Sequence, residues 1–201
     1  MRFIDDLKAL LITTNSNKTI TDNMIEVEVK ARIDSFEEIE EKLKTIGAEK
    51  TKTEFQEDIY FQSPIVDFAK TDEALRIRTT NSQTFITYKG PKLNEKAKTR
   101  KEVEMAIESA EKARDIFEEV GFTPARIVRK NRLYYTYENF EISLDDVEGL
   151  PPYMEIEVAL PDSEDYSEAQ NRIFELFARL DITEGFERTS YMELLENINT
   201  D

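Results

Sequence analysis

Cysteine and histidine are both absent from the 201 residues of this chain. Without cysteine there can be no disulfide, no thiolate nucleophile and no cysteine-ligated zinc, and without histidine there is no imidazole base or imidazole metal ligand. Catalysis of the Ser-His-Asp and Cys-His kinds is therefore excluded. The groups that remain for chemistry are carboxylates, lysine, arginine and tyrosine, together with a hard cation such as Mg²⁺ or Mn²⁺ bound through oxygen.

Long apolar runs and a positive net charge are missing as well. No window approaches the roughly 18–20 consecutive apolar residues of a membrane-spanning helix. Lysine and arginine number 27 against 43 aspartates and glutamates, which gives a formal net charge of −16. A chain this acidic is not expected to bind DNA, RNA or anionic lipid unaided. We therefore expect no nucleic-acid partner and no membrane partner.

The first 23 residues differ from the rest of the chain. Their apolar stretch at 10–12 is short and follows Asp5 and Asp6, which is unlike a secretory signal. We therefore expect a cytoplasmic protein in which residues 1–23 form an extension of unassigned role. Hydrophobic residues make up 39% of the chain, with 12 Phe and 8 Tyr, which is enough for a buried core. No shift in composition marks a second domain, so we expect a single domain over residues 24–196.

From Met24 onward the chain is dominated by alternation of apolar and charged residues, which is typical of strands. Eight segments show this pattern, and most are joined by short turns or hairpins, so the sheet should be largely antiparallel. The predicted strands are 24–33, 54–61, 74–79, 84–89, 98–106, 126–137, 140–147 and 153–160. Eight strands are enough to close into a barrel.

Three amphipathic segments predict helices over 35–46, 109–120 and 166–180. The first begins with the capping box Ser35-x-x-Glu38 and ends at Gly47. Three residues of this region have an identical residue 74 positions later, which suggests two related β-α-β halves. The matching pairs are Ser35 and Ser109, Gly47 and Gly121, and Tyr60 and Tyr134.

Ionic residues occupy alternate positions on strand after strand and therefore share one face of the predicted sheet. They are Glu26, Glu28 and Lys30; Arg76 and Arg78; Lys98, Arg100, Glu102 and Glu104; Lys130 and Arg132; Glu155 and Glu157; with Lys89 and Asp145 on neighbouring strands. One interpretation is the solvated face of a half-buried antiparallel sheet. The other is a closed barrel with helices outside, in which the ionic faces line a tunnel.

A tunnel lined by arginine and lysine needs a polyanion as its ligand, and carboxylates beside these cations imply a divalent cation bridging to the same anion. A polyphosphate with Mg²⁺ or Mn²⁺ satisfies both. Arginine makes bidentate contacts to phosphate and lysine neutralises charge, while the metal stabilises charge on the leaving oxygens. No glycine-rich phosphate loop is present, which fits capture by side chains.

In their order along the chain, these motifs resemble the CYTH superfamily, also called the triphosphate tunnel metalloenzymes. The hallmark E-x-E-x-K is Glu26-Val27-Glu28-Val29-Lys30. The other matching segments are 58–61 (DIYF), 75–78 (LRIR), 87–90 (TYKG), 98–100 (KTR) with Glu102 and Glu104, 129–132 (RKNR), 144–147 (LDDV), 155–157 (EIE) and 190–195 (SYMELL). The resemblance runs from Met24 to about Leu195.

This resemblance implies an α+β fold, an eight-stranded antiparallel closed β-barrel flanked by helices. It also implies two sets of site residues. The triphosphate would be held by Lys30, Arg76, Arg78, Lys89, Lys98, Arg100, Lys130 and Arg132. One or two Mg²⁺ or Mn²⁺ ions would be held by Glu26, Glu28, Asp145, Glu155 and Glu157.

Members of the family are class IV adenylyl cyclases, which turn ATP into cyclic AMP and pyrophosphate, or triphosphatases acting on thiamine triphosphate or tripolyphosphate. The layout of residues 144–157 favours the cyclase branch. With no histidine, we expect the catalytic groups among Glu26, Glu28, Lys30 and Lys89. The proton acceptor would be a metal-bound hydroxide, a carboxylate or a lysine, for which Lys30 and Lys89 are the candidates. A non-catalytic polyphosphate-binding module and a purely structural barrel remain open, as does the homodimer that family members often form.

Three tyrosines on the predicted strands, Tyr60, Tyr88 and Tyr134, could stack on a base or thiazole ring. Aromatic residues in strands more often serve packing, and we expect that role for them.

Overall fold

A computed structural model describes residues 24–92, 100–161 and 166–198 of the chain, so the predicted extension at 1–23 lies outside the described residues. The described strands are β1 (Met24–Arg32), β2 (Glu49–Gln62), β3 (Ala74–Thr80), β4 (Thr84–Lys92), β5 (Arg100–Ile107), β6 (Thr123–Tyr137), β7 (Phe140–Val147), β8 (Tyr153–Pro161) and β9 (Phe186–Glu187). The described helices are α2 (Phe36–Ile46), α3 (Phe68–Thr71), α4 (Ala110–Glu119), α5 (Tyr166–Arg179) and α6 (Tyr191–Ile198). None of these helices is both long enough and apolar enough to cross a membrane.

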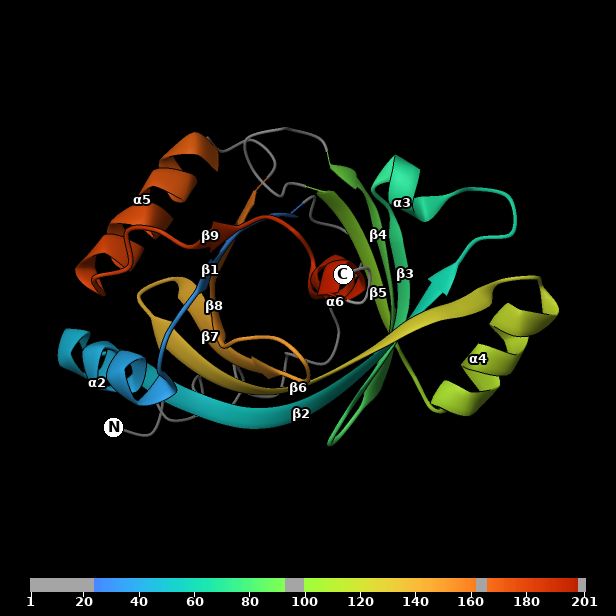
Figure 1. The fold of residues 1–201 in the computed structure, drawn as a ribbon, viewed down its shortest axis with the longest axis horizontal. Helices are drawn as coiled ribbons and strands as arrows, with labels where there is room; N and C mark the ends of the chain where they lie inside the picture. The colour runs from blue at the N-terminus through green and yellow to red at the C-terminus, as the bar shows by residue number, and fades with distance from the viewer. Residues whose placement is uncertain (1–23, 93–99, 162–165, 199–201) are drawn as a thin grey trace, which may run out of the picture.

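All nine strands form one antiparallel sheet in the order β5-β4-β3-β2-β6-β7-β8-β1-β9. The two longest strands, β2 and β6, pair over almost their whole length in the middle of the sheet. On either side of them the sheet curls, so that β1, β7 and β8 face β3, β4 and β5 across a concave space (Figure 1). The predicted antiparallel arrangement is confirmed.

The prediction of a closed barrel of eight strands is wrong, because the sheet is open and has nine described strands. Strand β9 pairs with the edge of β1 at Lys30 and Ala31, and the sheet ends at β5 on one side and β9 on the other, without hydrogen bonds joining the two edges among the described residues. Because β9 has only two residues, it carries no alternation that the sequence could reveal. It occupies the edge of β1 only at Lys30 and Ala31.

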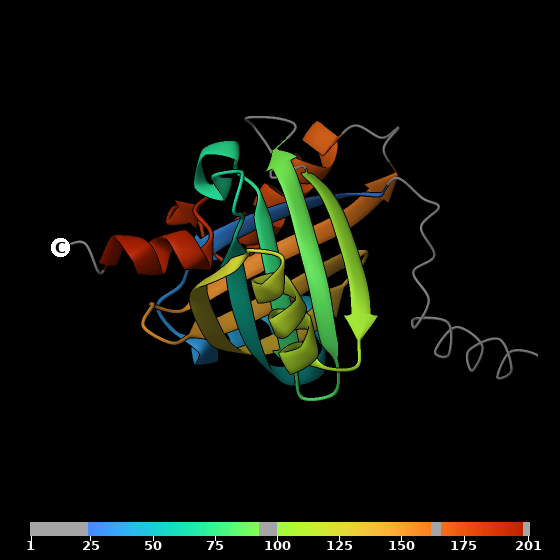
Figure 2. The same ribbon diagram turned by 90° about the vertical axis from the view of Figure 1, so that its right-hand side faces the viewer.

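The apolar faces of the strands lie on the outside of the curl, beneath the helices. Val27 and Val29 of β1 pack with Ile156 of β8 in a core covered by α2 and α5, which includes Leu43 and Phe177. A second core, with Ile77 of β3 and Phe117 of α4, lies on the other flank. These two cores place the helices on the convex face (Figure 2).

Local signals account for the ends of the first and third helices. The Ser35 hydroxyl accepts a hydrogen bond from the backbone N–H of Glu38 at 3.3 Å, and α2 stops at Gly47, whose φ of 87° suits glycine. Ser109 caps α4 in the same way through Lys112, at 3.2 Å. The 74-residue echo therefore corresponds to two strand–helix–strand units, β1-α2-β2 and β5-α4-β6.

Helix α6 is the exception to the outer layer, because it packs at one end of the concave face. Its Tyr191 and Leu195 form a small apolar cluster with Val128, Val147 and Tyr153. Seen along the curl, α6 lies between the two walls of the sheet, and the side view shows it leaving from one end (Figures 1 and 2). Helix α6 thus occupies one end of the concave space.

Candidate functional site

Those ionic residues predicted to share a face whose side chains the structure describes lie on the concave side of the sheet. This follows from strand parity, because their apolar neighbours are in the outer cores. The sheet is open, yet Arg76, Lys130 and Arg132 are only 8%, 4% and 7% exposed. A solvated sheet face would leave these cations in water. Burial of so many ionic groups, each needing counter-charge, disfavours the purely structural interpretation.

Asp145 of β7 is the centre of the first ionic cluster. Arg132 of β6 donates to it from Nε to Oδ1 at 2.6 Å, and Lys130 donates to Oδ2 at 3.1 Å. The other end of the Arg132 guanidinium contacts Glu155 of β8 as well as Asp145. Burial alone would raise the pKa of Asp145, but Arg132 and Lys130 outweigh it and the pKa is lowered. The carboxylate is therefore charged and held by cations.

Two lysines of this cluster lie against tyrosine rings at the α6 end. The Nζ of Lys30, which is 1% exposed, is 4.2 Å from the ring centroid of Tyr191 and 5.6 Å from that of Tyr153. Lys30 also donates a hydrogen bond to the backbone carbonyl of Thr189. Lys130 Nζ is 5.0 Å from the Tyr191 centroid. Burial, with the nearby Arg132 charge, lowers the pKa of Lys130 to about 8.

A second ionic cluster is centred on Asp58 of the central strand β2, next to β6. Arg78 of β3 donates to both of its oxygens, at 2.6 and 2.7 Å, and Arg76 donates to Oδ2 at 3.3 Å. Burial would raise the pKa of Asp58, but Arg76 and Arg78 outweigh it and lower the pKa, with a smaller effect from Lys130 on the adjacent strand β6. Nearby, Lys89 pairs with Glu102 at 2.9 Å.

Asp58 stands in the motif at 58–61, but the sequence did not identify it as a site residue. Because Asp58 neutralises two buried arginines, its replacement by asparagine is expected to destabilise the protein by about 3–5 kcal/mol at pH 7. The charged form is favoured in the fold, so its contribution is present above the ordinary pKa of 3.8 and is lost as the pH falls through the lower folded value. Urea unfolding at several pH values measures the free energy of unfolding of the unmodified protein and of Asp58→Asn. The difference between the two values should become smaller as the pH falls.

The matched control is Asp67→Asn, which removes an aspartate paired with Lys70 at 2.9 Å on the surface. That pair is exposed to solvent, which screens its charges, so its loss should change the free energy of unfolding far less. Equal effects of the two substitutions would contradict the structural role given to Asp58.

A third group consists of four glutamates from three adjacent strands. Glu157 of β8 lies opposite Glu28 of β1 on one side and Glu141 of β7 on the other, and Glu26 also contributes. Burial, followed by the charges of Glu26, Glu141 and Glu28, raises the pKa of Glu157 to about 9. Sequence analysis missed Glu141, although its spacing of four from Asp145 on one strand predicts the same face.

These carboxylates suit a hard divalent cation, because all their donors are oxygens and because like charges crowd one another. Among the described residues, no three acids already converge into a metal site. Asp145 and Glu155 are instead held by Arg132. An anion that took over Arg132 would release both carboxylates, so the residues fit a metal that binds together with an anionic ligand.

The remaining predicted residues divide as follows. Lys98 lies outside the described residues, and of Arg100 only the backbone is described, at the start of β5. Tyr88 lies on the convex face, where its hydroxyl donates to Glu73. Tyr134 is buried on the concave face. Its hydroxyl accepts a hydrogen bond from Gln56 at 2.7 Å, and Lys52 Nζ lies 4.3 Å from its ring centroid.

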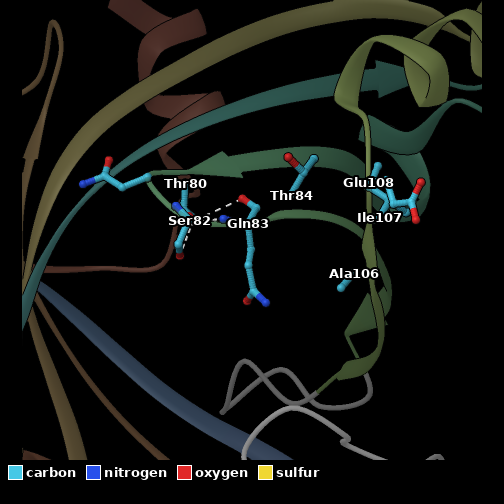
Figure 3. A pocket seen from close by; sticks show the side chains of 8 residues that line it. Thr80, Ser82, Gln83, Thr84, Ala106, Ile107 and Glu108 are labelled. Carbon is cyan, nitrogen blue, oxygen red and sulfur yellow. Dashed lines mark hydrogen bonds between the residues drawn. The ribbon is translucent and has the colours of Figure 1, made fainter.

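A cavity of about 480 Å³ lies away from these clusters, at the β3–β4 turn and the end of β5 (Figure 3). Its lining residues are Thr80, Asn81, Ser82, Gln83, Thr84, Ala106, Ile107 and Glu108. Glu108 is the only ionic side chain among them, and it is negative. This cavity therefore lacks the cations that a polyanion needs.

The described chain is thus a curled antiparallel sheet whose concave face buries arginines, lysines and carboxylates side by side. The chain belongs to the CYTH domain family, whose sequence model matches residues 24–191. The family suggested by the order of the motifs is thus confirmed.

Individual relatives agree with this assignment. The chain is 44% identical over 172 residues to a protein of Methanocaldococcus jannaschii named "Putative adenylate cyclase MJ0240", covering 85% of this chain and 98% of that one. It is 41% identical to PH1819 of Pyrococcus horikoshii OT3, with a TM-score of 0.79 over 86% and 99% of the two chains. At 20% identity, Hippeastrum HpAC1, described as having a dominant triphosphatase activity, shares the fold with a TM-score of 0.62 over 87% and 95%.

Proposed function

We propose that this protein is a divalent-metal-dependent enzyme acting on a triphosphate bound along the concave face, and that it converts ATP into cyclic AMP and pyrophosphate. The observation that carries the proposal is the buried Arg132, held by Asp145 and Glu155 within one continuous ionic surface. The name of the 44% identical relative supports the cyclase reaction over other triphosphate chemistry.

Binding is an exchange of partners. In the free protein, carboxylates neutralise the cations of both ionic clusters, Asp145 in the first and Asp58 in the second. A triphosphate brings its own oxygens to the cations, which are Lys30, Arg76, Arg78, Lys89, Lys130 and Arg132 among those whose side chains are described. The released Asp145 and Glu155, with Glu26, Glu28 and Glu157, would hold Mg²⁺ or Mn²⁺, which supplies charge stabilisation on the phosphate oxygens.

In the cyclase reaction, the ribose 3′-oxygen bonds to the α-phosphorus while the bond from that phosphorus to the β-phosphate oxygen breaks, and pyrophosphate leaves. The 3′-hydroxyl proton passes to a basic group on the concave face, for which Glu26, Glu28, Lys30 and Lys89 are our candidates. The chain contributes by fixing the phosphates in line for attack with buried guanidinium groups, where the low dielectric strengthens each contact.

Hydrolysis of tripolyphosphate or thiamine triphosphate is the second candidate, and the state of Tyr134 favours it. The ring lies between Lys52 at 4.3 Å and Arg132 at 5.6 Å from its centroid, and its hydroxyl is engaged by Gln56. A tyrosine packed in this way is not an open platform for stacking on adenine. Tripolyphosphate has no ring and would not need such a platform, so the packing of Tyr134 favours tripolyphosphate rather than thiamine triphosphate within this candidate.

Product analysis separates the two reactions. We expect purified protein with Mg²⁺ or Mn²⁺ to convert ATP into cyclic AMP and pyrophosphate, resolved by chromatography. Orthophosphate from tripolyphosphate or thiamine triphosphate, with no cyclic product, would move the assignment to triphosphatase. No turnover of any of the three would leave a polyphosphate-binding module.

Arg76→Ala is expected to raise the KM for the triphosphate substrate by roughly 10–100-fold, the cost of one charge-assisted contact. Arg76 is 8% exposed, and its Nε is buried without a hydrogen-bond partner, so it has donor capacity for a ligand oxygen. Arg129→Ala is the matched control, because this arginine lies on the convex side of β6 and pairs with Glu57 at 2.6 Å. An equal rise in KM in both variants would rule out a specific phosphate contact at Arg76.

A further inference from the structure

We infer that Tyr191 is a positioning residue with two separable roles: its hydroxyl orients Asp145, and its ring seats Lys30 and Lys130. This inference rests on the proposed function, because it concerns the residues that would hold the metal and the triphosphate. Tyr191 itself lies at the start of α6, far along the chain from every strand that carries the ionic residues.

The hydroxyl contact is direct. Tyr191 Oη donates to Asp145 Oδ2 at 2.8 Å, the same oxygen that Lys130 reaches at 3.1 Å. When a ligand takes Lys130 and Arg132 from Asp145, the tyrosine hydroxyl remains to hold the carboxylate. A hydrogen bond of this kind fixes the direction of a metal-binding carboxylate and commonly changes metal affinity 10–100-fold.

The ring contact concerns the two lysines. Lys30 comes from β1 and Lys130 from β6, and their Nζ atoms lie 4.2 and 5.0 Å from the same ring centroid. An aromatic face attracts cations without neutralising their charge. The ring therefore holds both lysines in place without cancelling their charge, also after Lys130 has left Asp145 for a phosphate.

The segment that carries Tyr191 is fixed on both sides, so the ring is a rigid platform. Before Tyr191 in the chain, the backbone of Glu187 in β9 pairs with that of Lys30 in β1. The N–H of Arg32 donates to the carbonyl of Gly185 at 2.9 Å. At the start of α6, Glu193 accepts hydrogen bonds at 2.7 Å from the backbone N–H and the hydroxyl of Ser190, which in turn accepts from the Glu193 N–H at 3.2 Å. This is a capping box that sets the direction of the first helical turn.

The two roles predict different losses in two variants of the full chain. Tyr191→Phe keeps the ring and removes the hydroxyl, so Mn²⁺ affinity should fall about 10-fold or more, while tripolyphosphate affinity in metal-free buffer should change less than about threefold. Tyr191→Leu removes both, so tripolyphosphate affinity should also fall by about 10-fold. Electron paramagnetic resonance measures the Mn²⁺ affinity in the presence of a saturating, non-hydrolysable tripolyphosphate analogue, because the anion must first free Asp145 from Arg132. Calorimetry with tripolyphosphate alone measures the second constant, and neither measurement involves turnover.

Tyr153→Phe is the control, since Tyr153 packs against Tyr191 with ring centroids 5.5 Å apart but does not donate to Asp145. It should leave both constants unchanged. Unchanged Mn²⁺ affinity in Tyr191→Phe would overturn the inference, and so would equal losses in Tyr153→Phe. If Tyr191→Leu fails to fold, the phenylalanine variant still decides the hydroxyl role. Absence of tripolyphosphate binding by the unmodified protein would instead overturn the proposed function, and this inference with it.

Discussion

Replacement of Glu155 by glutamine is expected to lower metal-dependent turnover by about two to three orders of magnitude while the protein remains folded. The loss follows from removing a charged oxygen ligand for the cation beside the phosphate-binding Arg132. The fold should survive because Arg132 keeps its pairing with Asp145, and because the glutamine oxygen can still accept from the guanidinium. The measurement is initial rate against Mn²⁺ concentration, with circular dichroism as the test of folding.

Glu148→Gln is the control for this substitution. Glu148 is 73% exposed, and its pairing with Arg129 at 3.8 Å lies outside the concave face. Its rate should equal that of the unmodified protein. Full activity in Glu155→Gln would contradict the assignment of Glu155 as a metal ligand.

Glu157→Gln is expected to stabilise the metal-free protein by roughly 2–3 kcal/mol at pH 7. Burial and the charges of Glu26, Glu141 and Glu28 raise the pKa of Glu157 from 4.5 to about 9. A raised folded pKa means that stability is greatest below 4.5 and declines as the pH rises to about 9. Glutamine does not titrate, so the advantage of the variant should grow with pH across this window and vanish near pH 4.

The same substitution should remove the response to metal. Mn²⁺ or Mg²⁺ with tripolyphosphate is expected to raise the Tm of the unmodified protein more than that of Glu157→Gln, because the cation relieves the crowding of the glutamates. A residue that costs stability in the free protein and is needed with ligand is typical of a functional site. The role of Glu157 would be contradicted if Glu157→Gln were less stable than the unmodified protein at pH 8. It would also be contradicted if metal with tripolyphosphate raised the Tm of both proteins equally.

Much of the fold could be predicted because each strand carries its own evidence. Alternation in β1, with Val27 and Val29 outward and Glu28 and Lys30 inward, depends only on neighbours in sequence. The two ends of helix α2 could be predicted from the capping residues Ser35 and Gly47. The order of the E-x-E-x-K and later motifs then indicated the family, which the comparisons confirm.

Closure of the sheet could not be predicted in this way, because it depends on which edges meet in space. Strand β9 has two residues and gains its place only by pairing with Lys30 and Ala31, about 155 positions earlier in the chain. Tyr191 was missed for a similar reason. It stands in the motif at 190–195, but the motif gives it no role, and only the fold brings its hydroxyl to Asp145 and its ring to Lys30.

The ionic pairing within the site is the other feature that sequence did not reveal. The alternation identified Arg76, Arg78 and Arg132 as cations of one face, but it did not show that Asp58 and Asp145 already neutralise them. This arrangement means that ligand and metal must displace existing partners. It also explains why the acids do not form a ready-made metal site in the described chain.

Calorimetric titration with tripolyphosphate, with and without Mg²⁺, tests most directly whether the concave face binds a triphosphate. We expect saturable binding by the unmodified protein that strengthens with Mg²⁺. Affinity should fall about 10-fold or more in Arg78→Gln, whose arginine faces the concave space, and stay unchanged in Arg129→Gln, whose arginine lies on the convex side. No binding, or equal affinity in both variants, would contradict the assignment of the concave face as the triphosphate site.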